Sequence, residues 1–388
     1  MIKIAHLGAY GLNLGDTVAL NNIRLQVAKY TKEEIRWVPI NITVFHGFRN
    51  NIKKTCAYFQ KHLDGVDALI VGGGGLIECG PQHHDMETGW KLPFSEKMFE
   101  SYGKDFPPIY VIGAGINYFR KYSEEDQFNR SGVESLKDLI NRARFFSVRN
   151  DGSYTKIMKL LGGDAQLHLR DKISEIPDPG LIYDHEVPRR TKEECEDLPV
   201  AFQPAFNNNR GVMAGRSLSL EDSRSACNRK QLYRLVREND LKVLPHTPKD
   251  FRDFEEHESL VSKLKFTKNS GIEEYSGLLD LYNTIKASVA MRGHGQMIAL
   301  GLNVPSVYFS TQDKVLNFSQ QHQLMEYNVD IEDPDWYQGL QQKMEKICHD
   351  EEYRLVWYEK RDKLVNSFKR QFEIVCHEII NDIEENKK

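Results

Sequence analysis

The chain alternates short apolar runs with amphipathic helical patterns, and the alternation occurs twice along its length. Strands are predicted at residues 2–7, 35–40, 68–71, 109–112 and 145–148, and then at 200–203, 241–244, 288–291 and 307–309. Helical patterns of about 10–15 residues separate most of these runs, and this spacing predicts parallel sheets with helices on both faces. We therefore expect an α/β protein with two doubly wound, Rossmann-like domains that face each other across a cleft.

The length of the chain also favours two domains, because 388 residues are too many for one ordinary hydrophobic core. Residues 184–197 are polar and charged and have no periodicity, which is typical of a linker. We predict an N-terminal domain over residues 1–185 and a C-terminal domain over residues 186–388. The C-terminal domain is expected to carry an anion site and to end in charged helices.

The composition is that of a soluble globular protein, with 40% hydrophobic and 28% charged residues. A formal net charge of −4 argues against a nucleic-acid binder, which usually carries a basic field. The six cysteines are far apart, which suits reduced thiols. No signal region and no run of about 18 apolar residues is evident. We expect a cytoplasmic protein whose membrane contact, where it has any, is peripheral.

Residues 284–317 place charged groups where two predicted strands end. Arg292 and His294 follow the strand at 288–291, and Lys314 follows the next strand. Open α/β sheets bind ligands at this edge, and arginine is well shaped to hold a carboxylate or phosphate. Charged groups in an apolar segment are costly to bury without a partner or a ligand. We predict a site for a small dianion beside an imidazole.

The turn from Gly11 to Asp16 follows the first strand. Its glycines allow close approach of a ligand to the backbone, and Asp16 is a good N-cap candidate for the next helix, whose N-terminus can bind an anion. Asn13, Gly15 and Asp16 are therefore candidate site residues. In the alternative, Asp16 only caps the helix.

Other candidates also lie at strand ends. Gly73 and Gly74 belong to a run of four glycines, which either lines the ligand cleft or lets a neighbouring loop pack on bare backbone. Arg149 precedes a helix and suits an anion, although it could instead pair with Asp151 at the surface. His246 either binds substrate or is structural.

Neither a metal site nor a dinucleotide site is favoured. Cys79, His83, His84 and Asp85 cluster as metal ligands can, but adjacent histidines on a loop rarely bind one ion together. With Trp90, these side chains better suit a polar and aromatic wall for a sugar. The glycine turns lack the lysine of a Walker loop and the third glycine of a dinucleotide fingerprint.

Taken in order, these motifs resemble the polysaccharide pyruvyl transferase family over about residues 7–320. The motifs are GLNLGD with Asn21-Asn22, VGGGGLI, SVRNDGSY, Pro177-Asp178-Pro179 and SVAMRGHGQMIALGLNVPSVYFSTQDKV. The resemblance implies a two-domain GT-B enzyme that transfers an enolpyruvyl unit from phosphoenolpyruvate to sugar hydroxyls. A pyruvate ketal forms, phosphate is released, and neither a metal nor a nucleotide cofactor is implied.

The resemblance places the family's Arg-x-His element on Arg292 and His294. His294 would then be a general acid or base, because its reference pKa of ~6.5 lies close to working pH, and Asp16 would be a second candidate base. Lys314 and Arg149 would help Arg292 to hold the two anionic groups of the donor.

The resemblance also implies a sugar or polysaccharide acceptor, free or lipid-linked, bound on the side of the N-terminal domain. Gly293 stands where many relatives carry a bulky residue. The His83-His84 loop and the insertion at residues 207–223 match no family motif.

Two other functions remain open. One is a GT-B glycosyltransferase that uses a nucleotide sugar, although no clear Glu-x7-Glu pattern is present. The other is a non-catalytic glycan-binding relative that keeps the fold, against which the charged groups at 292, 294 and 314 argue.

Overall fold

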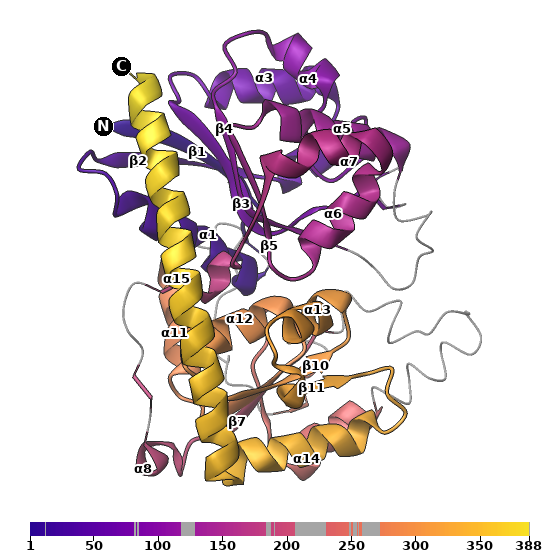
Figure 1. Ribbon diagram of the computed structural model, residues 1–388, viewed down its shortest axis with the longest axis vertical. Coiled ribbons are helices and arrows are strands. Elements are labelled where there is room, and N and C mark those ends of the chain that lie inside the picture. The colour runs from indigo at the N-terminus through magenta and orange to yellow at the C-terminus, as the bar shows by residue number, and fades with distance from the viewer. Residues whose placement is uncertain are drawn as a thin grey trace.

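The protein contains two separate parallel sheets, each flanked by helices (Figure 1). The structure is a computed structural model and describes residues 1–11, 13–80, 83, 85–117, 129–183, 188–189, 191–205, 230–247, 250, 254, 256–257 and 272–387. His84 and the insertion at 207–223 lie outside these residues. The predicted α/β class is confirmed.

The first sheet has six strands in the order β2-β1-β3-β4-β5-β6, all paired in parallel. Their bounds are β1 Ile2–Gly8, β2 Ile35–Asn41, β3 Ala68–Ile77, β4 Ile109–Ile116, β5 Phe145–Arg149 and β6 Ile173–Ile176. The connecting helices are α1 Leu14–Ala28, α2 Thr43–Gly47, α3 Ile52–His62, α4 Glu96–Tyr102, α5 Arg130–Arg142, α6 Ser153–Leu161 and α7 Gly163–Leu169.

The second sheet has five strands in the order β11-β10-β9-β7-β8, again in parallel. The strands are β7 Val200–Gln203, β8 Lys242–Val243, β9 Ala287–Ala290, β10 Ser306–Ser310 and β11 Asn328–Asp330. The helices are α8 Lys192–Cys195, α11 Ile272–Tyr282, α12 Gly293–Gly301, α13 Asp313–Gln321, α14 Trp336–His349 and α15 Glu351–Lys387.

The strand order reverses once in each sheet, and ligands of open α/β sheets bind at such a switch point. In the first sheet the reversal lies between β1 and β3, whose carboxyl ends lead into the Gly11–Asp16 turn and the glycine run. In the second sheet it lies between β7 and β9, so that Gln203 and Arg292 are neighbours.

Helix α1 begins at Leu14, and its N-cap is Asn13, whose Oδ1 accepts a hydrogen bond from the Gly15 amide at 3.1 Å. The expectation that Asp16 caps this helix is therefore wrong. Asn13 reaches the free amides first, and Asp16 falls in the first turn, where a carboxylate is still favoured by the helix dipole. Its side chain is thus available for other contacts.

Helix α15 runs along both halves of the molecule (Figure 1). Near its start, Arg361 donates to the carbonyls of Leu300 and Gly301 at 2.8 and 2.9 Å, which end α12. Near its end, Glu384 accepts a hydrogen bond from Thr31 at 2.6 Å. Because the C-terminal end of the chain returns to the first sheet, contacts along α15 stabilise both halves together.

The polar segment at 184–197 contains the short helix α8, which begins at a capping box formed by Thr191 and Glu194. Residues 184–187 and 190 lie outside the described part of the chain. The domain boundary at 185/186 stays a prediction.

Candidate active site

The two switch points meet at the N-terminus of α1. The Leu14 amide donates to the carbonyl of His246 at 3.0 Å, which joins the first half of the chain to the second. A Cβ on Gly15 would lie 2.5 Å from the Cβ of His294 and 2.9 Å from its ring. A side chain at position 15 would therefore push the two halves apart, and the predicted site residues Asn13, Gly15 and Asp16 all lie at this junction.

His294 lies in the first turn of α12 between two carboxylates of the first half. Its Nδ1 is 3.3 Å from Oδ1 of Asp16, and its Nε2 is 3.6 Å from Oδ2 of Asp178. Nη1 of Arg149 is also 3.2 Å from Nε2. Because the guanidinium can only donate, Nε2 accepts, and a neutral ring then carries its proton on Nδ1, facing Asp16.

The imidazole of His294 is kept neutral by its surroundings. Burial, together with the charges of Arg149 and Lys314, lowers its pKa from 6.5 to about 3, and the charge of Asp16 acts in the opposite direction. An imidazole with such a pKa is a weak base in the empty site. Negative charge placed near Arg149 and Lys314 would raise its basicity.

Arg149, the last residue of β5, is 1% exposed and is held by two aspartates. Its Nη1 donates to Asp178 at 2.8 Å, and its Nη2 is 3.1 Å from Asp151. A Cβ on Gly115 would lie 1.9 Å from Nη2, so this glycine makes room for the guanidinium. The pair with Asp151 exists, but it is buried at the junction of the two halves and is not the surface pair considered from the sequence.

Arg292 is already paired in this structure. Its Nη2 donates to both oxygens of Asp250, at 2.6 and 2.8 Å, and its Nε donates to the carbonyl of Pro204 at 3.1 Å. Its backbone amide is bound by Gln203 at 3.0 Å. Within the described part of the chain, Nη1 is left for a ligand, so Arg292 can offer one edge of its guanidinium.

Lys314 lies in the first turn of α13, beside the other cations. Burial and the charge of Arg149 lower its pKa to about 8, while Asp151 and Asp16 act in the opposite direction. A Cβ on Gly293 would lie 3.4 Å from its Cε, so the small residue at position 293 lets the lysine pack beside the start of α12. Lys314 is a cation near pH 7 and is placed to contact an anion.

The glycine run packs mainly against α1. Gly73 has a φ of 75° and lies against the backbone of Leu20, whereas a Cβ on Gly74 would meet Oδ1 of Asp16 at 2.6 Å. Gly74 therefore borders the site, and Gly73 serves the packing of the helix. A direct contact of either with substrate stays a prediction.

His246 contributes to the junction through its backbone more than through its ring. Its ring is buried, with Nε2 3.1 Å from the hydroxyl of Tyr282, and its amide donates to Asp250 at 3.2 Å. Burial, together with the charge of Arg292, holds the pKa of His246 well below its usual value. A role of this ring in substrate binding stays a prediction.

Sequence reasoning gave no role to Asp178 and did not consider Asp250. Asp178 is 2% exposed, and Asp250 is fully buried. Asp178 was visible only as part of the Pro-Asp-Pro motif, and its contact with Arg149 depends on how the chain folds. The sequence does not show which carboxylates are buried and pair with the cations, and the structure does.

The expected polar and aromatic wall around the His83 loop is wrong for Trp90 and stays a prediction for Asp85. Trp90 is fully buried and donates to the carbonyl of Phe94 at 2.8 Å. Asp85 is exposed and lies 3.7 Å from Arg49. No group of His, Cys, Asp and Glu side chains suited to a metal occurs among the residues that the structure describes.

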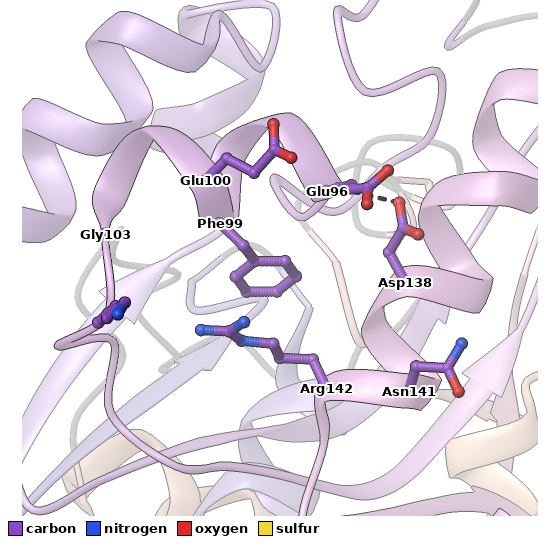
Figure 2. A pocket seen from close by; sticks show the side chains of 8 residues that line it. Glu96, Phe99, Glu100, Gly103, Asp138, Asn141 and Arg142 are labelled. Atoms are coloured by element: carbon purple, nitrogen blue, oxygen red, sulfur yellow. Dashed lines mark hydrogen bonds between the residues drawn. The ribbon is translucent and has the colours of Figure 1, made fainter.

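A pocket of about 460 Å³ lies between α4 and α5, in the part of the first half that faces away from α12 and α13 (Figures 1 and 2). Figure 2 shows Arg142 next to the ring of Phe99, with 5.1 Å between the guanidinium carbon and the ring centroid. Its other lining residues are Glu96, Glu100, Gly103, Lys104, Asp138 and Asn141. None of the candidate site residues lines this pocket.

None of the helices in the described ranges has the length and apolar content needed to cross a membrane.

Known proteins resemble the chain in sequence motifs and in fold. A family model described as polysaccharide pyruvyl transferase matches residues 13–313. A UDP-GlcNAc 2-epimerase from Neisseria meningitidis, bound to UDP-GlcNAc, superimposes with a TM-score of 0.53 and 11% identity over 98% of this chain and 100% of that chain. The S. aureus MnaA-UDP co-structure superimposes with a TM-score of 0.49 and 11% identity, over 95% of this chain and 96% of that chain. An α-glucosyltransferase in complex with UDP superimposes with a TM-score of 0.47 and 10% identity, over 100% of both chains.

No curated protein matches the chain. At 11% identity, the likeness to the Neisseria epimerase shows the fold alone, and this fold is the predicted GT-B arrangement.

Proposed function

The chain belongs to the polysaccharide pyruvyl transferase family, and we propose that it transfers the pyruvyl group of phosphoenolpyruvate to two hydroxyls of one sugar. The sugar would be part of a polysaccharide or of its precursor. The product would be a pyruvate ketal, with phosphate as the leaving group. The family match supports the reaction class, and the site geometry supports the roles of individual residues.

The observation that carries the proposal is the position of His294. This titratable group comes from the second half of the chain and lies within 3.6 Å of Asp16, Arg149 and Asp178 of the first half. A donor and an acceptor bound on opposite sides of the junction would both reach it. Such placement suits proton transfer between two substrates.

The donor carries a phosphate and a carboxylate, and three cations are available for them. Arg292 offers Nη1, Lys314 offers its ammonium group, and Arg149 lies behind His294. Arginine and lysine bind such groups through charge-assisted hydrogen bonds. We assign the donor to this cluster.

Proton transfer can be written with the neutral His294. With the donor bound, Arg149 would turn its Nη1 from Nε2 to the anionic groups of the donor, which leaves the lone pair of Nε2 open. The first sugar hydroxyl then adds through its oxygen to C2 of phosphoenolpyruvate, and its proton passes to Nε2. The imidazolium, stabilised at Nδ1 by Asp16, then gives this proton to C3, which becomes the methyl group. The second hydroxyl replaces the phosphate at C2, and its proton leaves with the phosphate.

The test is release of phosphate from phosphoenolpyruvate by the purified protein, with galactose-, mannose- and glucuronate-containing acceptors. We expect acceptor-dependent release that falls at least about 100-fold in His294→Gln, as is typical for loss of a general acid or base. Calorimetry should show that this variant still binds phosphoenolpyruvate.

Absence of both release and donor binding would contradict the proposal, and binding of UDP-GlcNAc would then favour a nucleotide-sugar enzyme. Donor and glycan binding without any turnover in the unmodified protein would favour a non-catalytic relative.

A further inference from the structure

A second polar cluster lies at the carboxyl end of β3 and β4 and has no part in donor binding. It consists of Glu78, His83, Lys91 and Asn117. Nε2 of His83 is 3.2 Å from Oε1 of Glu78, while Asn117 donates to Oε2 at 3.0 Å and Nζ of Lys91 lies 3.7 Å from Oε2. Glu78 and His83 are buried, and Lys91 and Asn117 reach the surface.

The cluster adjoins the donor site through one peptide unit. The carbonyl of Gly75 accepts hydrogen bonds from Lys91 at 2.8 Å and from Asn117 at 3.0 Å. The preceding residue, Gly74, has Asp16 directly against it. Because Gly74 and Gly75 are consecutive, with Cα atoms about 3.8 Å apart, the cluster borders the part of the site that contains Asp16.

The chemistry of the cluster differs from that of the donor site. Burial would raise the pKa of Glu78, but hydrogen bonding from His83 and the charge of Lys91 lower it to about 2, so the carboxylate is ionised. The formal charges of Glu78 and Lys91 cancel. The cluster therefore offers a carboxylate and an amide oxygen as acceptors and an ammonium group as donor, and no net charge that would attract an anion.

From this geometry we infer that Glu78, Lys91 and Asn117 form the acceptor subsite and bind hydroxyls of an uncharged hexose. The inference rests on the proposed function, since it places the sugar beside the donor. Glu78 accepts a hydrogen bond from one hydroxyl, Lys91 donates to the oxygen of a neighbouring hydroxyl, and Oδ1 of Asn117 accepts from another, since both N–H groups of Asn117 already donate to Gly75 and Glu78. His83 fixes the orientation of the carboxylate and acts as a positioning residue.

The inference is tested by binding of methyl β-D-galactopyranoside, methyl β-D-mannopyranoside and methyl β-D-glucuronide, measured by saturation-transfer NMR without donor. We expect the neutral glycosides to bind more tightly than the glucuronide. Glu78→Gln and Lys91→Met should each raise the dissociation constant for neutral glycosides about 10-fold or more, because a hydrogen bond to a charged group is lost. The affinity for phosphoenolpyruvate should stay unchanged.

Glu87→Gln is the matched control, since Glu87 lies on the same loop but is exposed and binds Asn51 and the Ile52 amide. Thermal unfolding checks that the variants fold, and Lys91→Met, at a partly exposed position, keeps the test open where Glu78→Gln does not fold. If the cluster only stabilised the loop, the substitutions would weaken the binding of glycoside and of phosphoenolpyruvate together.

Unchanged glycoside affinity in folded Glu78→Gln or Lys91→Met, preference for the glucuronide, or no binding of either neutral glycoside would overturn the inference. These outcomes are separate from failure of the proposed function. Phosphate release that depends on His294 could persist without this subsite, and glycoside binding at the subsite could occur without any release.

Discussion

The neutral state of His294 makes the stability of the protein depend on pH in a way that can be measured. In the unfolded chain the imidazole takes up a proton near its ordinary pKa of 6.5, whereas in the folded protein burial and the nearby cations lower the pKa to about 3. Between these values the unfolded state binds the proton and the folded state does not. The contribution of His294 to stability is therefore complete above about pH 6.5 and is lost as the pH falls.

The size of the effect follows from the two pKa values. A pH of 5 lies about 1.5 pH units below the unfolded pKa of 6.5, and each pH unit corresponds to about 1.36 kcal/mol. The free energy of unfolding is therefore about 2 kcal/mol lower at pH 5 than above pH 6.5. By pH 3 the loss approaches about 5 kcal/mol on the same basis. At pH 5 the result depends almost entirely on the pKa of the unfolded state, because the pKa of the folded state lies well below pH 5.

The assay is urea unfolding of the unmodified protein and of His294→Gln at pH 7.5 and 5.0. Other buried histidines, such as His6 and His246, also have lowered pKa values and remain in both proteins, so that their effects cancel. We expect the unmodified protein to lose about 2 kcal/mol more than the variant between the two pH values. Equal losses, or an imidazole that NMR shows to be protonated at pH 5 in the folded state, would refute the reasoning.

Three further predictions concern the groups around His294. Lys314→Met should weaken phosphoenolpyruvate binding and remove a fall in affinity above about pH 8, which calorimetry of both proteins would reveal; affinity that is flat across pH 8 in the unmodified protein would contradict it. Asp250→Ala should lower the free energy of unfolding by about 3–5 kcal/mol, because Arg292 is left buried without its carboxylate; a loss under 1 kcal/mol in urea would argue against a buried pair. Gly15→Ala should leave the protein folded and reduce kcat/KM for phosphate release about 100-fold, because the added methyl group displaces the His294 ring. Activity close to that of the unmodified protein would show that the contact between Gly15 and His294 adapts to the methyl group.

The fold was predictable because its signal is local. Strands β1 to β5 contain the apolar runs from which they were predicted, and the sequence spacing alone indicates parallel pairing, whereas β6 alternates apolar and polar residues and was not among those runs. The cap of α1 was misplaced by three residues, since Asn13 and Asp16 are both good caps and only the backbone decides between them. The return of α15 to the first sheet left no local signal, because its contacts with Thr31 are made across the whole chain.

The site was predictable where a charge follows a strand, and not where charges pair across the chain. Arg149, His294 and Asp16 were named from their positions and do meet. The pairing of Arg292 with Asp250 could not be foreseen, because the aspartate lies 42 residues away in a segment without clear periodicity. The partner of a buried cation is fixed by tertiary structure, so the sequence indicates which residues matter better than it indicates what they touch.

The charges of the site indicate why the acceptor should react only when the donor is also bound. Three cations, Arg149, Arg292 and Lys314, stand beside the carboxylates of Asp16, Asp151, Asp178 and Asp250, and in this setting the pKa of His294 is about 3. A base works best when its pKa lies near the working pH, so the empty site holds a poor one. Burial is the main cause of this low pKa and the cations add to it; the phosphate and carboxylate of the donor would offset the cations and so raise the basicity of the imidazole. A sugar hydroxyl bound without the donor would find a poorer base than one bound together with the donor.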